Sequence, residues 1–196
     1  GEHTIRSMQY IRADKVLRLT MLLHDVAKPV CRTEDENGIH HFHGHPQVGA
    51  EMSRKILRRL KFDNDTIHRV MALVRAHDDR PPLQGRSVRR AIYRNGTEQY
   101  PELFEVKRAD ILAQSSFLQQ EKLLYVDRYE HMYQQIMEKE QFLSLKELAV
   151  NGSDLIARGI QPGKEIGEIL HQMLEKVLEE PELNEKEVLL AWYFKA

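Results

Sequence analysis

The chain has 196 residues, and its 29 lysines and arginines nearly balance its 30 aspartates and glutamates, which gives a formal net charge of -1. This balance excludes a histone-like basic protein and an acidic tail, and the 41% hydrophobic content excludes a disordered chain. The single cysteine, Cys31, excludes an internal disulfide framework and a cysteine-rich zinc finger. No apolar run is long enough to cross a membrane, so we predict a cytoplasmic protein.

Helical patterns follow one another from the start of the chain. Asp14 precedes a segment from Lys15 to Asp25 that is apolar on nearly every side, which is the pattern of a helix buried all round. Residues 29–44 are polar and loop-like. Pro46 suits the first turn of the next helix, and a further helix is predicted over residues 65–78.

The second half of the chain continues this pattern. Four further helices are expected over residues 87–93, 101–117, 118–138 and 164–179. A last helix is expected over 184–195, where Asn184 and Glu187 have the spacing of a capping box. No alternating pattern predicts a strand. The sequence therefore predicts an all-α protein, with a helical body over residues 1–142 and a smaller helical tail over 143–196.

Polar residues interrupt the apolar stripes of four predicted helices. His24 and Asp25 end the most apolar helix, while His45, His77 and Asp110 lie where packing expects aliphatic side chains. One such residue alone is more often a satisfied core histidine or a helix cap. Four together favour a divalent metal ion, because neutral imidazoles and carboxylates are its usual ligands. One ion fits these residues, and so do two ions that share a bridging aspartate and a hydroxide.

The order of these residues resembles the H…HD…D signature of HD-domain metal-dependent phosphohydrolases. His24 and Asp25 lie in the run LLHDVAKP, Asp110 lies in the run RADI, and His3 precedes both. The resemblance implies an HD-domain helical bundle in which His3, His24, Asp25 and Asp110 hold one ion. The two additional histidines of the dinuclear branch are matched by His45 and His77.

Longer stretches are similar to the C-terminal half of bacterial CCA-adding tRNA nucleotidyltransferases. The similar runs are HGHPQVGAE at 43–51, KRADILAQS at 107–115, NGSDL at 151–155 and GIQPGKEIG at 159–167. In that family an HD domain and a helical, RNA-contacting tail follow a nucleotidyltransferase head. The chain contains no Gly-Gly-x-x-Arg-Asp run. We therefore expect no nucleotidyltransferase activity from it alone, and expect it to be a part of a longer protein.

The first functional hypothesis is a metal-dependent phosphohydrolase acting on phosphomonoesters or on cyclic or terminal phosphates of nucleotides or RNA. One or two divalent ions (Fe, Mn, Ni, Co or Zn, with Mg as a further candidate) would lower the pKa of bound water to about 7. Catalytic roles are predicted for Asp25, Lys28 and His43. Lys28 lies one turn beyond the His-Asp pair, where it would contact a substrate phosphate, and Asp78 would orient an imidazole.

The alternative hypothesis is a non-catalytic, tRNA-binding body and tail of a CCA-adding enzyme, in which the HD site serves the structure. Two predicted helices carry basic residues that could meet RNA phosphates: Arg54, Lys55, Arg58, Arg59 and Lys61 on one, and Arg86, Arg89, Arg90 and Arg94 on the other. Solvated helix faces explain many of these equally well. The candidate phosphate or RNA contacts are Lys28, Arg58, Arg90 and Lys164. The expected partners are a phosphorylated nucleotide or an RNA 3′ end, and tRNA through the parent protein, but no membrane.

Overall fold

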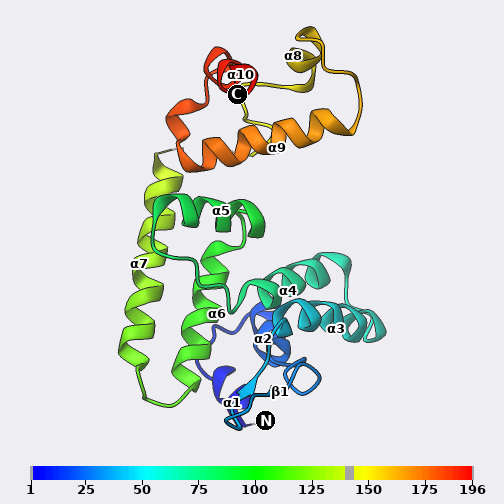
Figure 1. Ribbon diagram of the computed structural model, residues 1–196. Helices are drawn as coiled ribbons and strands as arrows, with labels where there is room; N and C mark the ends of the chain where they lie inside the picture. Colours follow the sequence, from blue (N-terminus) through cyan, green and yellow to red (C-terminus); the bar gives the residue numbers. More distant parts are fainter. Residues whose placement is uncertain (1, 140–143, 196) are drawn as a thin grey trace. The chain divides into compact units, whose positions relative to one another are not determined.

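A computed structural model of the chain describes residues 2–139 and 144–195, and it confirms a mostly α-helical protein (Figure 1). The helices in these residues are α1 Glu2–Ser7, α2 Lys15–Leu23, α3 His45–Arg59, α4 Asn64–Ala76, α5 Gly85–Asn95, α6 Tyr100–Ala113, α7 Gln119–Glu138, α8 Gly152–Ala157, α9 Lys164–Glu179, a 3₁₀ turn η1 Pro181–Leu183, and α10 Lys186–Lys195. None of the described helices is long and apolar enough to cross a membrane.

A small hairpin occupies the segment that the sequence predicts as loop. Strands β1 Thr33–Glu34 and β2 His40–His41 pair antiparallel, with Thr33 opposite His41 and Glu34 opposite His40. Each strand has only two residues, so no alternating pattern can develop along it.

The described residues form two compact units. The first comprises residues 2–80 and 95–128, and the second comprises 81–94, 129–139 and 144–195. The division falls within α7 and places α5 in the second unit. The predicted boundary between residues 142 and 143 lies outside the described residues, so it stays a prediction.

Helix α2 forms the centre of the first unit, in contact with α1, α4 and α6. Its Leu17 and Met21 are fully buried, whereas Leu22 is 50% exposed. The prediction of a helix buried all round is therefore wrong on one side, because the neighbouring helices leave that side of α2 uncovered. The predicted cap is confirmed: the carboxylate of Asp14 accepts hydrogen bonds from the backbone N–H groups of Val16 at 2.8 Å and Leu17 at 3.0 Å.

We expect the Asp14→Ala change to lower the free energy of unfolding by about 1 kcal/mol at neutral pH, because it removes an N-terminal cap. Hydrogen bonds from the Leu17 and Val16 N–H groups lower the pKa of Asp14 in the folded chain. The contribution is therefore complete above the ordinary aspartate pKa of about 3.9 and is lost as the pH falls through the lower, folded pKa. Urea unfolding of both proteins between about pH 3 and pH 7 measures this.

The neutral variant Asp14→Asn is the control, since its amide oxygen still accepts the capping bonds. It should lose less stability than Asp14→Ala, and the difference in stability between these two variants should not change with pH over this range. A difference between wild type and Asp14→Ala that does not shrink on acidification would contradict a charged cap.

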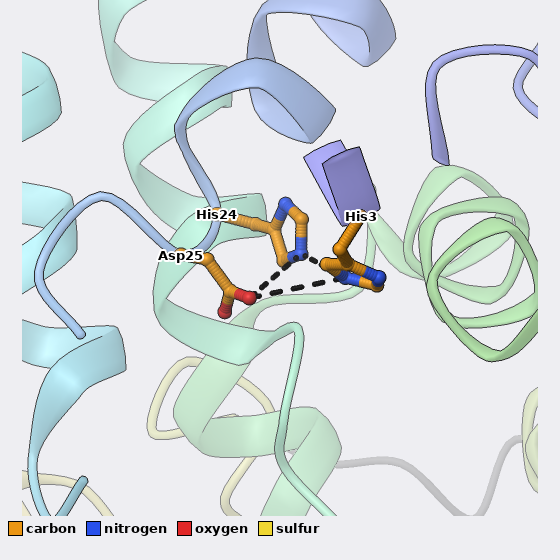
Figure 2. Close-up of side chains that lie close together, drawn as sticks. All are labelled: His3, His24 and Asp25. Carbon is orange, nitrogen blue, oxygen red and sulfur yellow. Dashed lines mark hydrogen bonds and ion pairs between the residues drawn. The ribbon is translucent and has the colours of Figure 1, made fainter. Parts of the chain in front are cut away.

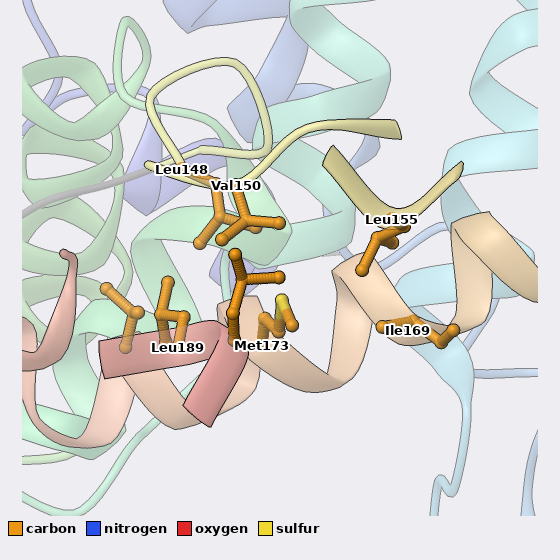
Figure 3. Close-up of a cluster of buried hydrophobic side chains, with 8 residues drawn as sticks. Leu148, Val150, Leu155, Ile169, Met173 and Leu189 are labelled. Carbon is orange, nitrogen blue, oxygen red and sulfur yellow. The ribbon is translucent and has the colours of Figure 1, made fainter. Parts of the chain in front are cut away.

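The second unit has its own hydrophobic core (Figure 3), formed by α8, α9, α10 and the segment before α8. Its buried members are Leu148, Val150, Leu155, Ile169, Met173, Val177, Leu189 and Leu190. The capping box of this unit lies at Asn151 and Asp154, at the start of α8. The capping box predicted at Asn184 is wrong, because the Asn184 side chain instead pairs with the backbone of Ala149 at 2.8 Å and Glu147 at 3.0 Å.

Arg89 also has a structural position in this unit. It is buried, and its guanidinium donates to the carbonyls of Leu178 at 2.7 Å and Glu179 at 2.9 Å, at the C-terminal end of α9. The last carbonyls of a helix lack partners within the helix, so Arg89 satisfies groups that would otherwise be unpaired. Arg89 is therefore not available to RNA phosphates, contrary to the prediction from its basic helix.

Candidate metal centre

The structure brings together, in the first unit, all six side chains that the sequence suggests as metal ligands. They come from five segments: His3 from α1, His24 and Asp25 from just after α2, His45 from the first residue of α3, His77 from just after α4, and Asp110 from α6. Figure 2 shows three of them, His3, His24 and Asp25, converging.

The first group of donor atoms surrounds the Nε2 atom of His3. That atom lies 2.9 Å from Asp110 Oδ1, 3.2 Å from His24 Nε2 and 3.8 Å from Asp25 Oδ2 (Figure 2). His24 Nε2 in turn lies 3.3 Å from Asp110 Oδ1 and 3.5 Å from Asp25 Oδ2. The donor atoms of His3, His24 and Asp25 thus lie within 4.8 Å of one another, and Asp110 Oδ1 contacts both imidazoles of this group.

The second group shares Asp25 with the first. The Nε2 atoms of His45 and His77 lie 3.3 Å apart, and they lie 3.7 Å and 3.8 Å from Asp25 Oδ1. Asp25 therefore turns one carboxylate oxygen to each group. This arrangement is suited to a bridge between two ions.

Three of the histidines have their neutral tautomer set by the backbone. The Nδ1 atoms of His24, His45 and His77 lie 2.8, 2.9 and 2.7 Å from the carbonyls of Met21, Phe42 and Val74. A carbonyl only accepts, so each Nδ1 carries the proton and donates it. In a neutral ring the Nε2 lone pair is then free, so the lone pairs of His45 and His77 face one another across 3.3 Å, and that of His24 faces His3 Nε2 at 3.2 Å. That spacing is close to the edge of about 3.3 Å expected for a tetrahedron with metal–nitrogen bonds of about 2.0 Å.

The local fold explains how these rings are placed. His24 and His77 each follow the last residue of a helix, where free carbonyls are available to their Nδ1–H groups. His45 opens α3 directly after Gly44, whose φ of 74° is a conformation that favours glycine. Gly44 thus lets the chain turn from the hairpin into α3 with His45 facing the cluster.

Asp25 has the surroundings that most favour a cation. Its Oδ1 atom is buried and accepts no hydrogen bond from any described residue, while Oδ2 accepts one from Lys28 Nζ at 2.7 Å. A buried carboxylate oxygen without a partner is costly, and a cation beside it removes that cost. The residues present therefore fit a divalent ion.

The electrostatics favour the metal-binding form of His45, Asp25 and Asp110 and oppose it at His24. Burial lowers the pKa of His45, which favours the neutral ring. Burial alone would raise the pKa of Asp25 and Asp110, but the nearby imidazoles, and Lys28 in the case of Asp25, outweigh it and lower both. Burial alone would lower the pKa of His24, but the carboxylates of Asp110 and Asp25 raise it by more, so the net shift is upward. Metal binding requires ionised carboxylates and neutral imidazoles, and His24 is the ligand at which a proton competes.

Three further predicted site residues, Lys28, His43 and Asp78, help to line a cavity of about 340 Å³ beside the cluster, together with Arg80. Lys28 pairs with Asp25, as described, and the ring of His43 stacks on that of His41. Asp78 pairs with Arg80 at 3.2 Å. Asp78 therefore does not orient an imidazole as predicted, because backbone carbonyls already hold the Nδ1 atoms.

Two supporting side chains were missed from the sequence. Gln114 donates to Asp110 Oδ2 at 2.9 Å and is itself held by Lys122 at 2.8 Å. Lys107 is buried and donates to three backbone carbonyls around His77. Its burial lowers the pKa of Lys107 to about 8. A signal exists for Lys107, since it precedes Asp110 by three residues and so shares its face of α6.

Comparison with known proteins assigns the family. The sequence model of tRNA nucleotidyltransferase domain 2 matches residues 33–193. The chain belongs to the tRNA nucleotidyltransferase family. It is 33% identical over 180 residues to a CC-adding tRNA nucleotidyltransferase of Thermus thermophilus, covering 89% of this chain and 40% of that protein. It is also 33% identical over 167 residues to an A-adding tRNA nucleotidyltransferase of Deinococcus radiodurans, covering 83% of this chain and 38% of that protein.

These matches correct one prediction. The relatives are named as transferases that act on tRNA, and the matching family model is that of a tRNA nucleotidyltransferase domain. The prediction that this chain is a phosphohydrolase is therefore wrong. The catalytic roles predicted for Asp25, Lys28 and His43 depended on that activity and are withdrawn with it. The chain spans about two fifths of the length of these relatives.

Proposed function

We propose that this chain is the non-catalytic, tRNA-binding C-terminal part of a tRNA nucleotidyltransferase, in which the histidine and aspartate cluster is a structural metal centre for up to two divalent ions. The family assignment supports the link to tRNA. The single observation that supports the metal centre is the environment of the Asp25 carboxylate. Its Oδ1 atom is buried without a hydrogen-bond partner and faces His45 and His77, while its Oδ2 atom faces His3 and His24.

The proposed ligands would tie the first unit together. The facing Nε2 and carboxylate atoms would donate their lone pairs to a bound divalent ion, whose positive charge would balance the carboxylates. His3, His24 with Asp25, and Asp110 would join α1, the end of α2 and α6, while His45 and His77 would join the start of α3 to the end of α4. Since these segments are far apart in the sequence, such cross-links stabilise the folded state over the unfolded chain.

A basic surface at the end of α3 supports RNA binding. It consists of Lys55, Arg58, Arg59 and Lys61, and all four are exposed. Among the described residues, no acidic side chain lies within ion-pair distance of any of them. Charges left unpaired in this way can attract RNA phosphates without competition from a neighbouring carboxylate.

The other predicted RNA contacts are less favourable. Arg90 pairs with Glu175 at 2.7 Å, Lys164 pairs with Glu168 at 3.2 Å, and Lys28 pairs with Asp25 at 2.7 Å. The paired carboxylate partly neutralises each of these three cations and so weakens its attraction for a phosphate. The surface at the end of α3 is therefore the part of the described chain that we propose to contact the tRNA backbone.

A variant with Lys55, Arg58, Arg59 and Lys61 all changed to glutamine tests this surface. We expect its affinity for a tRNA transcript to fall about tenfold or more at low salt. The dependence of log affinity on log salt should become shallower by up to about 0.7–1 for each lost phosphate contact. Fluorescence anisotropy at several salt concentrations measures both effects.

The matched control removes four paired cations of the same unit, Arg12, Lys15, Arg54 and Arg69, again by change to glutamine. It changes the net charge equally but should leave the tRNA affinity near that of wild type. If both variants weaken binding to the same extent, net charge rather than this surface is responsible. If the wild-type chain itself does not bind tRNA, the proposed function is wrong.

A further inference from the structure

A buried lysine holds the backbone that carries one proposed metal ligand. Lys107, on α6, is only 5% exposed. Its Nζ atom donates to the carbonyls of Ala76 at 3.3 Å, His77 at 2.9 Å and Asp79 at 2.5 Å. We infer that Lys107 is a positioning residue, which fixes the end of α4 so that the His77 imidazole faces Asp25 Oδ1. This inference rests on the proposed metal centre.

The three contacts require an ammonium group. Each carbonyl only accepts, so three of them need three N–H donors, which a charged lysine provides and a neutral amine does not. The carbonyls of Ala76 and His77 lie at the C-terminal end of α4, where carbonyl groups lack helical partners and carry partial negative charge. Lys107 thus satisfies the end of the helix and fixes the course of the chain through His77.

Two contacts together determine where the His77 ring lies. The Val74 carbonyl accepts from its Nδ1 at 2.7 Å and so sets the rotation of the ring. Lys107 holds the main chain of the same residue through its carbonyl. Because Lys107 and Asp110 lie three residues apart on α6, this also links a proposed ligand of the first group to the backbone of a proposed ligand of the second.

An apolar side chain would fill this position at lower electrostatic cost. A buried ammonium beside a site for divalent cations loses hydration and is repelled by the ions, so packing alone does not account for it. The remaining alternative is that Lys107 only caps α4. Arg89 provides the comparison, because it too is a buried cation that caps a helix end, that of α9, but it belongs to the second unit, whereas the proposed ligands belong to the first.

The experiment compares Lys107→Met with Arg89→Met in the full chain. Cobalt(II) is titrated into each protein, with calorimetry for the affinities and visible absorption for the coordination geometry. We expect Lys107→Met to bind one of two ions about 10- to 100-fold more weakly and to alter the cobalt spectrum, as is typical when a group that orients a metal ligand is removed. Arg89→Met should lose stability without a change in either affinity or in the spectrum.

Binding results that match those of wild type would overturn the inference about Lys107. If Lys107→Met is less stable without metal but binds both ions with wild-type affinities and spectrum, Lys107 is only a helix cap and the inference is wrong. If Lys107→Met does not fold, Lys107→Arg replaces it: a forked guanidinium cannot place three donors at the position of one Nζ atom, so the same loss at one ion is expected. Unchanged binding in Lys107→Arg would then overturn the inference. A wild-type chain that binds no cobalt refutes the metal centre itself.

Discussion

Replacement of Asp25 by asparagine is expected to abolish tight binding of both ions. The two oxygens of this carboxylate face different donor groups, His3 with His24 on one side and His45 with His77 on the other. An amide of the same size keeps one weak oxygen ligand and loses the negative charge. We therefore expect the affinity at both positions to fall by at least about 100-fold. Calorimetric titration with zinc or cobalt measures this loss.

The control for this change is Asp127→Asn. Asp127 lies in the same unit, and its largely exposed side chain pairs with Arg108 at 2.7 Å, so the substitution removes the same charge from outside the cluster. It should bind metal as wild type does. If Asp25→Asn lost only one ion and bound the other with wild-type affinity, Asp25 would not be a shared ligand.

Removal of metal by a chelator is expected to lower the melting temperature of the wild-type chain by about 5 to 10 °C for each ion removed. Ligand present at about 100 times its dissociation constant stabilises a folded protein by about 2.7 kcal/mol. For a chain of this size, each kcal/mol shifts the melting temperature by roughly 2–4 °C. The Nε2 atoms of His24 and His3 lie 3.2 Å apart and those of His45 and His77 lie 3.3 Å apart, close enough for one ion to contact both atoms of each pair.

Asp25→Asn separates this effect from any general action of the chelator. The variant lacks the proposed bridge, so its melting temperature should not depend on metal or chelator. Differential scanning calorimetry with and without added zinc provides the comparison. Equal melting temperatures for wild type in both conditions would contradict a structural role of the ions.

Local patterns in the sequence predict much of the first unit. The Asp14 cap, the helix after it and the polar interruptions at His24, Asp25, His77 and Asp110 are all visible as deviations from a helical stripe. These deviations are informative because burying a polar side chain is costly, so several of them on neighbouring helices suggest a shared partner. His3 lies on no apolar stripe, and only the family resemblance indicated it.

Features that depend on contacts between distant residues were not predictable in this way. The sequence alone predicts that Arg89 is a surface arginine on a basic helix. Its burial and its bonds to the carbonyls of Leu178 and Glu179 are known only from the structure. Asn184 has capping-box spacing, yet its side chain pairs with Ala149 and Glu147, more than thirty residues away in the sequence. Lys107 does lie on the buried face of α6, but its role depends on carbonyls of α4.

The mistaken phosphohydrolase prediction has a physical reason. Histidines and aspartates in this order specify where a cation can bind, because ligand type and spacing follow from coordination chemistry. They do not specify what reaction occurs there, since the same site can serve catalysis or hold a fold together. The proposed ligand set resembles that of HD-domain hydrolases, whereas the longer similarity over residues 33–193 is to tRNA nucleotidyltransferases.

The most direct test of the metal centre is anomalous X-ray diffraction from crystals of the cobalt-loaded chain, measured at the cobalt absorption edge. We expect two peaks. One should lie within bonding distance of His3, His24, Asp25 and Asp110, and the other within bonding distance of Asp25, His45 and His77. A cobalt-loaded crystal with no peak at this cluster would contradict the proposed metal centre.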